Sequence, residues 1–194
     1  RDMDGMVLEN VVLTDALECC WHCRNAKLRG VQAEHGDYLF MHGENIDVDG
    51  FRLNGNYSFQ YCRNVVIRNA EIHSKDAFWN TEDVTVYDSV VDGEYLGWHS
   101  RNLRLVNCRI SGTQALCYAE NLVLENCTLG EDADLCFEYS SVHAEIKGRV
   151  HSVKNPRSGR IVAEEYGDII LDEHCKAPAN CSIETGKKQS GEAA

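Results

Sequence analysis

Hydrophobic and polar residues alternate in a short pattern that recurs about every 19 residues along the chain. The repeats align on six anchor positions, Asn25, Asn45, Asn64, Asp83, Asn102 and Asn121, with spacings of 20, 19, 19, 19 and 19 residues. The first and third residues after each anchor are apolar, as in RNVVIRNAEI from Arg63 and RNLRLVNCRI from Arg101. Such alternation is typical of a strand with one buried face. The unit is too short for a propeller blade and lacks the pattern of helical repeats.

Each coil carries further signals for bends and strands. The fifth position after the anchor holds Gly30, Gly50, Asn69, Asp88, Asn107 and Asn126, residue types that adopt left-handed backbone at low cost. A second short apolar segment follows, then a second bend at Gly36, Gly55, Ser74, Gly93, Gly112 and Gly130. Segments such as YLFMH and YLGWH predict a third strand, and a small residue two positions before each anchor predicts a tight inward corner.

The sequence therefore predicts an all-β, right-handed parallel β-helix, a solenoid with three short strands in each coil. Equivalent residues of successive coils would stack about 4.8 Å apart, and the asparagines at the bends would hydrogen-bond along the axis. A β-sandwich with accidental regularity is the alternative, and the near-identical spacings argue against it.

We expect one β-helix domain over residues 1–186, with regular coils at 9–141 and irregular terminal coils at 142–186. The segment SVKNPRSG at 152–159 predicts a turn, and the polar segment 187–194 predicts a disordered tail. A solenoid end exposes unpaired backbone and needs a cap. Because the chain opens on Arg1 without a visible cap, we expect either an earlier start in the native protein or a docked partner at that end.

Composition narrows the functional classes. A net charge of −12 repels phosphate backbones and argues against nucleic-acid binding. The sequence has no apolar run of the roughly 20 residues that a membrane span needs and no secretory signal pattern, so no membrane partner is expected. Among the ten cysteines, Cys108 and Cys127 are 19 residues apart, as are Cys117 and Cys136. We interpret these four as stacked core residues of a reduced, cytoplasmic protein.

Four segments resemble one known family: GDYLFMHGENI, SKDAFWNTEDVTVYDS, GEYLGWHSRNLRLVNC and SVKNPRSG. It is an uncharacterised bacterial domain of unknown function with the pectin-lyase-like right-handed β-helix fold, and the resemblance runs from about Gly5 to Thr185. It implies the fold, a bacterial origin and an absence of secretion, but no activity. The broader superfamily includes polysaccharide lyases and hydrolases. His42-Gly43 matches part of the polygalacturonase pattern, but the paired aspartates of that pattern and the calcium-binding carboxylates of pectate lyases do not appear.

An aromatic stripe is the strongest candidate for a binding site. The row four positions before the anchors reads Trp21, Met41, Gln60, Trp79, Trp98 and Cys117, and the more apolar row before it is assigned to the core. Strand alternation would turn the tryptophan row outward, where aromatic rings can stack on the apolar faces of sugars. The predicted binding residues are Trp21, His42, Trp79, Trp98, His99 and Tyr118. One alternative is that the strand faces the other way, so that these side chains point into the core. The other is that the row forms an interface with a protein partner or a second copy.

The catalytic candidates are Asp76, Glu94, Asp132 and Asp134, which lie near bends or in the expected third strand. Carboxylates on adjacent coils could reach the separation of about 5–10 Å that glycoside hydrolysis requires, although solvated surface acids are the simpler interpretation.

Two smaller motifs were also weighed. The segment CCWHC at 19–23 resembles a zinc knuckle, but a closed site needs four ligands, and Cys175 and Cys181 lie at the other end of the chain. We therefore expect no metal and no cofactor. Lys154, Asn155 and Arg157 form a small basic turn that could bind an anion or a carboxylated sugar.

The functional prediction is a module that binds a carbohydrate or a partner protein, with self-association through the tryptophan row or the uncapped end. The alternative is a carbohydrate-active enzyme, either a polysaccharide lyase or a glycoside hydrolase. Carboxylates that converge in a groove beside the aromatic row would favour the enzyme over the binding module.

Overall fold

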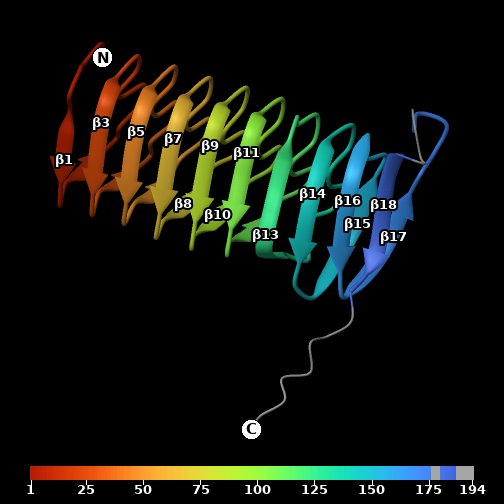
Figure 1. Ribbon diagram of the computed structural model, residues 1–194. Helices are drawn as coiled ribbons and strands as arrows, with labels where there is room; N and C mark the ends of the chain where they lie inside the picture. Colours follow the sequence, from red (N-terminus) through yellow and green to blue (C-terminus); the bar gives the residue numbers. More distant parts are fainter. Residues whose placement is uncertain (176–179, 187–194) are drawn as a thin grey trace, which may run out of the picture.

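The computed structural model describes residues 1–175 and 180–186 and has the predicted architecture, a right-handed solenoid of parallel strands (Figure 1). The coils follow one another along a single axis from β1 at one end to β18 at the other (Figure 1). The predicted disordered tail at 187–194 lies outside the described residues.

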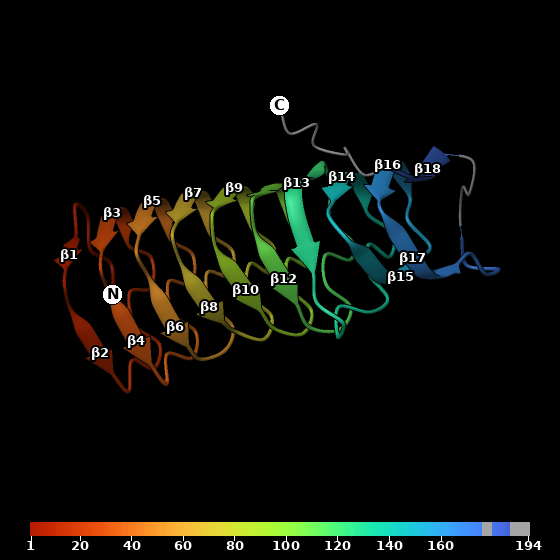
Figure 2. The ribbon, with the colours of Figure 1, turned by 90° about the horizontal axis from the view of Figure 1, so that it is seen from below.

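Two sides of the solenoid are parallel β-structure. The first side consists of β1 (Val7–Glu9), β3 (Arg24–Arg29), β5 (Glu44–Asp49), β7 (Arg63–Arg68), β9 (Glu82–Tyr87), β11 (Arg101–Val106), β13 (Leu122–Leu129), β14 (Ser141–Ile146), β16 (Ser158–Ala163) and β18 (Cys181–Thr185). The second side consists of β2 (Val12–Thr14), β4 (Gln32–Glu34), β6 (Arg52–Asn54), β8 (Glu71–His73), β10 (Val90–Asp92) and β12 (Arg109–Ser111), and it forms the lower row of strands in Figure 2. Strand β13 pairs with both β11 and β12 and so joins the two sides.

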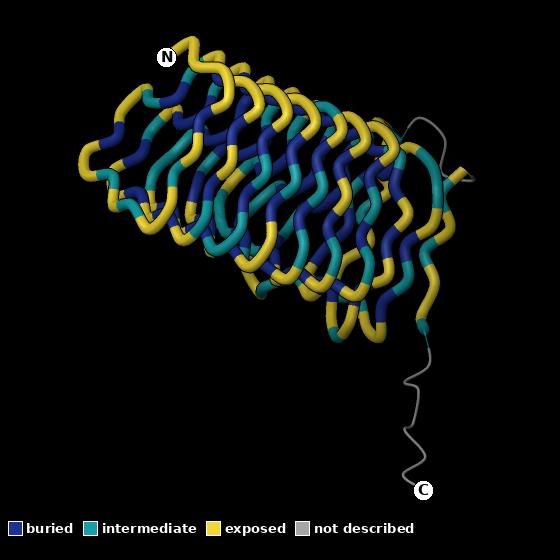
Figure 3. Tube along the Cα trace, turned by 60° about the vertical axis from the view of Figure 1, so that its left-hand side comes forward, coloured by how far each residue is buried: buried dark blue, intermediate teal, exposed yellow. Residues whose placement is uncertain are grey.

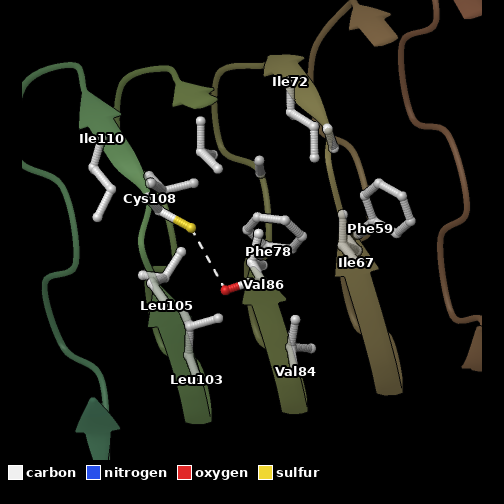
Figure 4. Packing of buried hydrophobic residues seen from close by; sticks show 14 of the residues in the cluster. Phe59, Ile67, Ile72, Phe78, Val84, Val86, Leu103, Leu105, Cys108 and Ile110 are labelled. Atoms are coloured by element: carbon white, nitrogen blue, oxygen red, sulfur yellow. Dashed lines mark hydrogen bonds between the residues drawn. The ribbon is translucent and has the colours of Figure 1, made fainter. Parts of the chain in front are cut away.

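The register confirms the predicted repeat. Val65 of β7 pairs with Ile46 of β5 and with Val84 of β9, so residues one repeat apart are direct neighbours across the sheet. The apolar positions after each anchor are buried, and buried and exposed residues alternate along the tube in Figure 3. Inside the solenoid Phe59 stacks between Phe40 and Phe78, with ring centroids 5.3 and 5.7 Å away. Figure 4 shows Phe59 and Phe78 among aliphatic side chains such as Ile72 and Val86.

The bends behave as the sequence predicts. All six residues at the fifth position after the anchor have positive φ, from 48° at Asp88 to 68° at Gly50. The anchor residues are left-handed as well, which was not predicted; Asn64, for example, has φ 51°. Their side chains hydrogen-bond along the axis, for example from Asn64 Nδ2 to Asn45 Oδ1 at 2.7 Å. These ladders satisfy side-chain polar groups that the tight bends bring together.

The third side differs from the prediction, because it is a run of turns in the regular coils and not a strand. Alternate residues are left-handed there, with φ of 59° at Tyr38, 60° at Phe40 and 56° at His42. Their amides still bond along the axis, Tyr38 N to Asn56 O at 2.8 Å and Phe40 N to Cys19 O at 3.1 Å. Axial hydrogen bonding therefore does not require extended backbone on this side, and strict in-out alternation is lost.

The C-terminal coils are less regular than the others, and the irregularity begins before residue 142. Strand β13 pairs with β14 through a register shift between Leu124 and Cys127. Two strands, β15 (Arg149–Lys154) and β17 (Glu165–Ile170), form a separate parallel pair on the second side. The predicted turn at 152–159 is narrower than expected, since strand structure extends to Lys154 and resumes at Ser158.

Candidate ligand-binding site

Three rows of residues, most of them at the surface, run along the turn side of the solenoid. The first row is Tyr38, Tyr57, Asp76, Tyr95 and Gln114; the second is Trp21, Met41, Gln60, Trp79, Trp98 and Cys117; the third is His22, His42, Tyr61, Asn80, His99, Tyr118 and Tyr139. In the second row the three tryptophans are half-buried at the surface, whereas Gln60 and Cys117 are buried. The tryptophans therefore lie outside the apolar core.

Four predicted binding residues form one cluster. Trp79 stacks on Trp98 with centroids 5.5 Å apart, and Trp98 lies 4.9 Å from Tyr118. His99 contacts both Trp79, at 5.4 Å, and Tyr118, at 5.0 Å. These contacts follow from the repeat, because equivalent side chains on adjacent coils are held one strand spacing apart.

The other two predicted binding residues lie elsewhere. His42 belongs to a separate stack, between His22 at 5.1 Å and Tyr61 at 4.8 Å, and burial lowers its pKa. Trp21 lies near the N-terminal end, where the Arg1 guanidinium covers its ring at 4.2 Å. Its indole N–H donates to the main-chain oxygen of Tyr38.

The outward ring stacks are interrupted in the coil at 75–82. There the first row carries Asp76 and the third row carries Asn80, so neither row has an aromatic ring in this coil. The flanking rings, Tyr57 with Tyr95 and Tyr61 with His99, are therefore two coils apart. Two coils correspond to about 9.6 Å, twice the strand spacing of about 4.8 Å. The surface is hollowed at both places, on either side of Trp79.

The first recess lies over Asp76 and has a volume of about 670 Å³. It is lined by Tyr38, Tyr57, Gln60, Tyr61, Lys75, Asp76, Trp79, Tyr95, Trp98 and Gln114. Tyr57 stacks on Tyr38 at 4.6 Å, which leaves its other face toward the coil of Asp76. The opposite wall, Tyr95, is held by an edge contact with Trp98 at 5.1 Å and by the Lys75 ammonium 5.2 Å from its centroid.

The carboxylate of Asp76 is the main polar group of this recess. The residue is only 8% exposed, and its carboxylate accepts no hydrogen bond within the part of the chain that the structure describes. Burial raises its pKa, the Lys75 ammonium opposes that rise, and Glu94 adds to it. Lys75 itself is ion-paired with Glu94 at 3.4 Å. The carboxylate oxygens still reach solvent through the recess, because neither of them is a fully buried atom without a hydrogen-bond partner. They are therefore accessible acceptors for the hydroxyl group of a ligand.

The tryptophans differ in their hydrogen bonding. Trp98 Nε1 donates to the main-chain oxygen of Gln114 at 2.6 Å, which fixes that ring on the next coil. The indole N–H of Trp79 makes no hydrogen bond with any residue that the structure describes. Gln60 beside it is held by a bond from Nε2 to the main-chain oxygen of Asp76 at 3.1 Å. The recess therefore combines an available donor with an available acceptor.

The four catalytic candidates do not converge. Asp76 and Glu94 lie on adjacent coils, with Asp76 N bonded to Glu94 O at 2.8 Å, but Lys75 already pairs with the Glu94 carboxylate. Asp132 and Asp134 lie beyond this recess, in the coil that follows Gln114, whose amide donates to Asp134 O at 2.8 Å. Of the four, only Asp76 lines the recess.

The two smaller motifs have structural roles. Burial and the neighbouring thiols Cys19 and Cys23 raise the pKa of Cys20 to about 12, and no group of three or more His, Cys, Asp or Glu side chains in the described residues is placed to hold a metal ion. In the basic turn Lys154 pairs with Glu138 at 3.0 Å.

The other members of the basic turn are engaged as well. Arg157 lies 4.0 Å from Glu120, and Asn155 donates to the carboxylate of Asp172 at 2.8 Å. Internal carboxylates thus take the place that a bound anion would occupy.

Two aromatic residues of the recess, Tyr57 and Tyr95, were not recognised from the sequence as part of a site. A signal was present, because tyrosine recurs seven positions before the anchor at 38, 57 and 95. The absence of a ring at Asp76 only becomes meaningful when that row is compared across coils.

A family model described as "Protein of unknown function (DUF3737)" matches residues 1–184. The chain belongs to the DUF3737 family. No curated protein matches this DUF3737 chain. Among solved structures it is similar to HetL, a pentapeptide repeat protein involved in heterocyst differentiation regulation from the cyanobacterium Nostoc sp. strain PCC 7120, at 14% identity over 89% of this chain and 88% of that chain, with a TM-score of 0.30. No helix in the described part of the DUF3737 chain is long and apolar enough to cross a membrane.

Proposed function

We propose that this DUF3737 protein is a non-catalytic carbohydrate-binding module that holds a sugar ring in the recess over Asp76. The observation that carries this proposal is the carboxylate of Asp76, which accepts no hydrogen bond from the described residues and lies in a gap between tyrosine rings. A sugar offers what both features need: hydroxyl groups to donate to the carboxylate and apolar C–H faces to contact the rings.

The width of the gap admits one ring. The two-coil separation is about 9.6 Å and carbon atoms in contact are about 3.5–4.0 Å apart, so a single ring, flat or puckered, fits between Tyr57 and Tyr95. The acceptor oxygens of Asp76 favour a ring that carries hydroxyl donors, as a sugar does. The Lys75 side chain at the rim narrows the opening and adds a donor for ring hydroxyls.

Binding is favoured over catalysis because only one of the candidate carboxylates lines the recess. An acid–base pair needs two carboxylates facing one bond, and Glu94 is directed to Lys75. The pectin-lyase-like resemblance of the sequence fits a sugar ligand without implying that the ligand is cleaved. A protein partner or a second copy remains the competing occupant of the same face.

The test is a glycan array of the full chain with three variants. Asp76→Tyr completes the tyrosine row and fills the recess, and the Trp79→Ala, Trp98→Ala double variant removes its floor; both should abolish binding. Asp168→Asn removes an exposed carboxylate on β17, distant from the recess, and should bind like the wild-type protein.

Two results would overturn the proposal. One is the absence of any glycan bound by the wild-type protein. The other is a wild-type dimer in analytical ultracentrifugation that the double tryptophan variant dissociates, because it would assign the aromatic face to self-association. Turnover of a bound glycan would instead favour the enzyme alternative.

A further inference from the structure

The same coil has a second recess on the other side of Trp79. It has a volume of about 420 Å³ and is lined by His42, Gly43, Glu44, Tyr61, Arg63, Asn80, Thr81, Glu82, His99 and Arg101. Tyr61 stacks on His42 at 4.8 Å and His99 on Tyr118 at 5.0 Å, so each of these two stacks ends at the coil of Asn80. The third row is interrupted in the same coil as the first row.

Polar groups line this second recess. Asn80 is exposed and its side-chain amide makes no hydrogen bond within the described residues, so a donor and an acceptor are accessible there. At the rim, Arg63 and Arg101 both pair with Glu82, at 3.5 and 3.3 Å. Glu44 also lines the recess, so two arginines face two glutamates and the recess offers hydrogen bonds without a strong net charge. That combination suits a neutral hydroxylated ring.

Backbone geometry does not explain why Asn80 and Asp76 interrupt the aromatic rows. Both residues are left-handed, with φ of 53° and 52°, a conformation in which Asn and Asp cost less than other residues. However, the equivalent Tyr57, Tyr95 and His99 adopt φ of 62°, 58° and 57°. The backbone at these positions therefore accepts aromatic side chains, so its conformation is not the reason why Asp76 and Asn80 lack a ring.

The two recesses lie across the solenoid and not along it. Asp76 and Asn80 are four residues apart on one coil, which limits their separation to about 14 Å, and Trp79 lies between them in the middle row. We infer that the ligand is an oligosaccharide that crosses the coil at 75–82, with one ring over Asp76, another over Asn80 and Trp79 beneath the segment that joins them. This inference rests on the proposed function and specifies the chain length and direction of its ligand.

The experiment compares single sugars with their oligomers. Glucose, galactose, mannose and N-acetylglucosamine, each with its linear di- to tetrasaccharides, are titrated into the full chain by calorimetry. The expected result is binding of one series with at least tenfold higher affinity for the tetrasaccharide than for the single sugar. Asn80→His restores the third row, fills the second recess, and should remove most of that advantage. Gln32→His introduces the same residue type on exposed β4 of the second side and should leave the advantage intact.

The outcomes separate the two proposals. If the wild-type protein binds none of these sugars, the proposed function fails and the inference with it. If the protein binds a single sugar and its tetrasaccharide with equal affinity, or if Asn80→His keeps the full advantage of the tetrasaccharide, only the inference fails. Circular dichroism and thermal unfolding verify that each variant is folded, and stacking of the new ring between Tyr61 and His99 should offset the left-handed strain.

Discussion

Asn102 donates its side-chain amide to the carboxylate of Asp83, 2.8 Å away on the preceding coil. Asn121 then donates to Asn102 at 3.1 Å, so each bond runs from a later coil to an earlier one. An aspartate can accept in such a ladder but cannot donate. Asp83 therefore begins a new run, and the ladder that ends at Asn64 is separate from it.

Replacing Asn102 tests how much the ladder stabilises the fold. Asn102→Ala removes two side-chain hydrogen bonds and places a Cβ without compensation at φ 56°, so we expect a loss of about 2 kcal/mol in the free energy of unfolding. Asn102→Gly removes the same bonds without the left-handed strain and should cost about 1 kcal/mol. Urea denaturation measures both. A glycine variant as stable as the wild-type protein would show that the ladder contributes nothing.

The buried thiols should resist modification. Seven cysteines are buried, and only Cys19, Cys175 and Cys181 are half-exposed. Burial raises the pKa of Cys62 to about 12, and a hydrogen bond with Cys127 together with burial raises the pKa of Cys108. The same hydrogen bond lowers the pKa of Cys127, but that side chain is fully buried and out of reach of a reagent. Since the thiolate is the reactive form, a disulfide reagent at pH 8 should react rapidly with about three thiols and with all ten only after unfolding.

The control for this count is Cys19→Ser, which should remove one rapidly reacting thiol. Rapid reaction of most of the cysteines in the native protein would contradict the burial of the stacked pairs. The same outcome would remove the argument that these cysteines are core residues.

His73 on β8 should make stability depend on pH. Hydrogen bonds with Glu71, at 3.0 Å, and Asp92, at 3.1 Å, raise its pKa above the usual value. The charged pair therefore stabilises the fold below the unfolded pKa of about 6.5, and this contribution disappears as the pH rises through the folded pKa. The pKa values of both carboxyl groups are lowered, which preserves the effect down to mildly acidic pH.

We therefore expect His73→Gln to lower the melting temperature more at pH 5.5 than at pH 8.5. The His73 side chain is 44% exposed, so solvent screening keeps the difference small. His143→Gln changes an exposed histidine on β14 that forms no ion pair with a described residue, and it should show no such difference. An equal loss for His73→Gln at both pH values would contradict the assigned pairing.

The sequence was sufficient to predict the two strand-forming sides, because buried and exposed residues alternate there with a strict period of two. Val65 and Ile67 are buried on one strand and their equivalents pair with them directly, so one coil predicts the next. The prediction of a strand on the third side was wrong for a physical reason. Residues such as Tyr38 and Phe40 favour strands when free, yet here they adopt left-handed backbone because axial hydrogen bonds and ring stacking compensate for the strain.

The candidate site was predictable in part. The tryptophan row was found because aromatic side chains recur at one position of the repeat, and Trp79 and Trp98 do contact each other. Asp76 was selected only as one acid among many, since its burial depends on the turn geometry of the third side. The recesses themselves were not predicted, because a missing ring leaves a hollow only where the turn geometry of the third side places the rows at the surface.

Gly93 at the second bend should be required for space and not for its conformational freedom. A Cβ added to Gly93 would lie 2.1 Å from the main-chain oxygen of Ser74 on the preceding coil, although the φ of Gly93 is not left-handed. Gly93→Ala should therefore force the coils apart at this bend and cost about 1–3 kcal/mol. Gly148→Ala is the matched control, because its Cβ meets no atom within 4 Å and only its φ of 75° opposes the change. We expect Gly148→Ala to cost about 1 kcal/mol. If thermal unfolding found Gly93→Ala to be the milder of the two substitutions, close approach of the coils would not be the reason for glycine at this position.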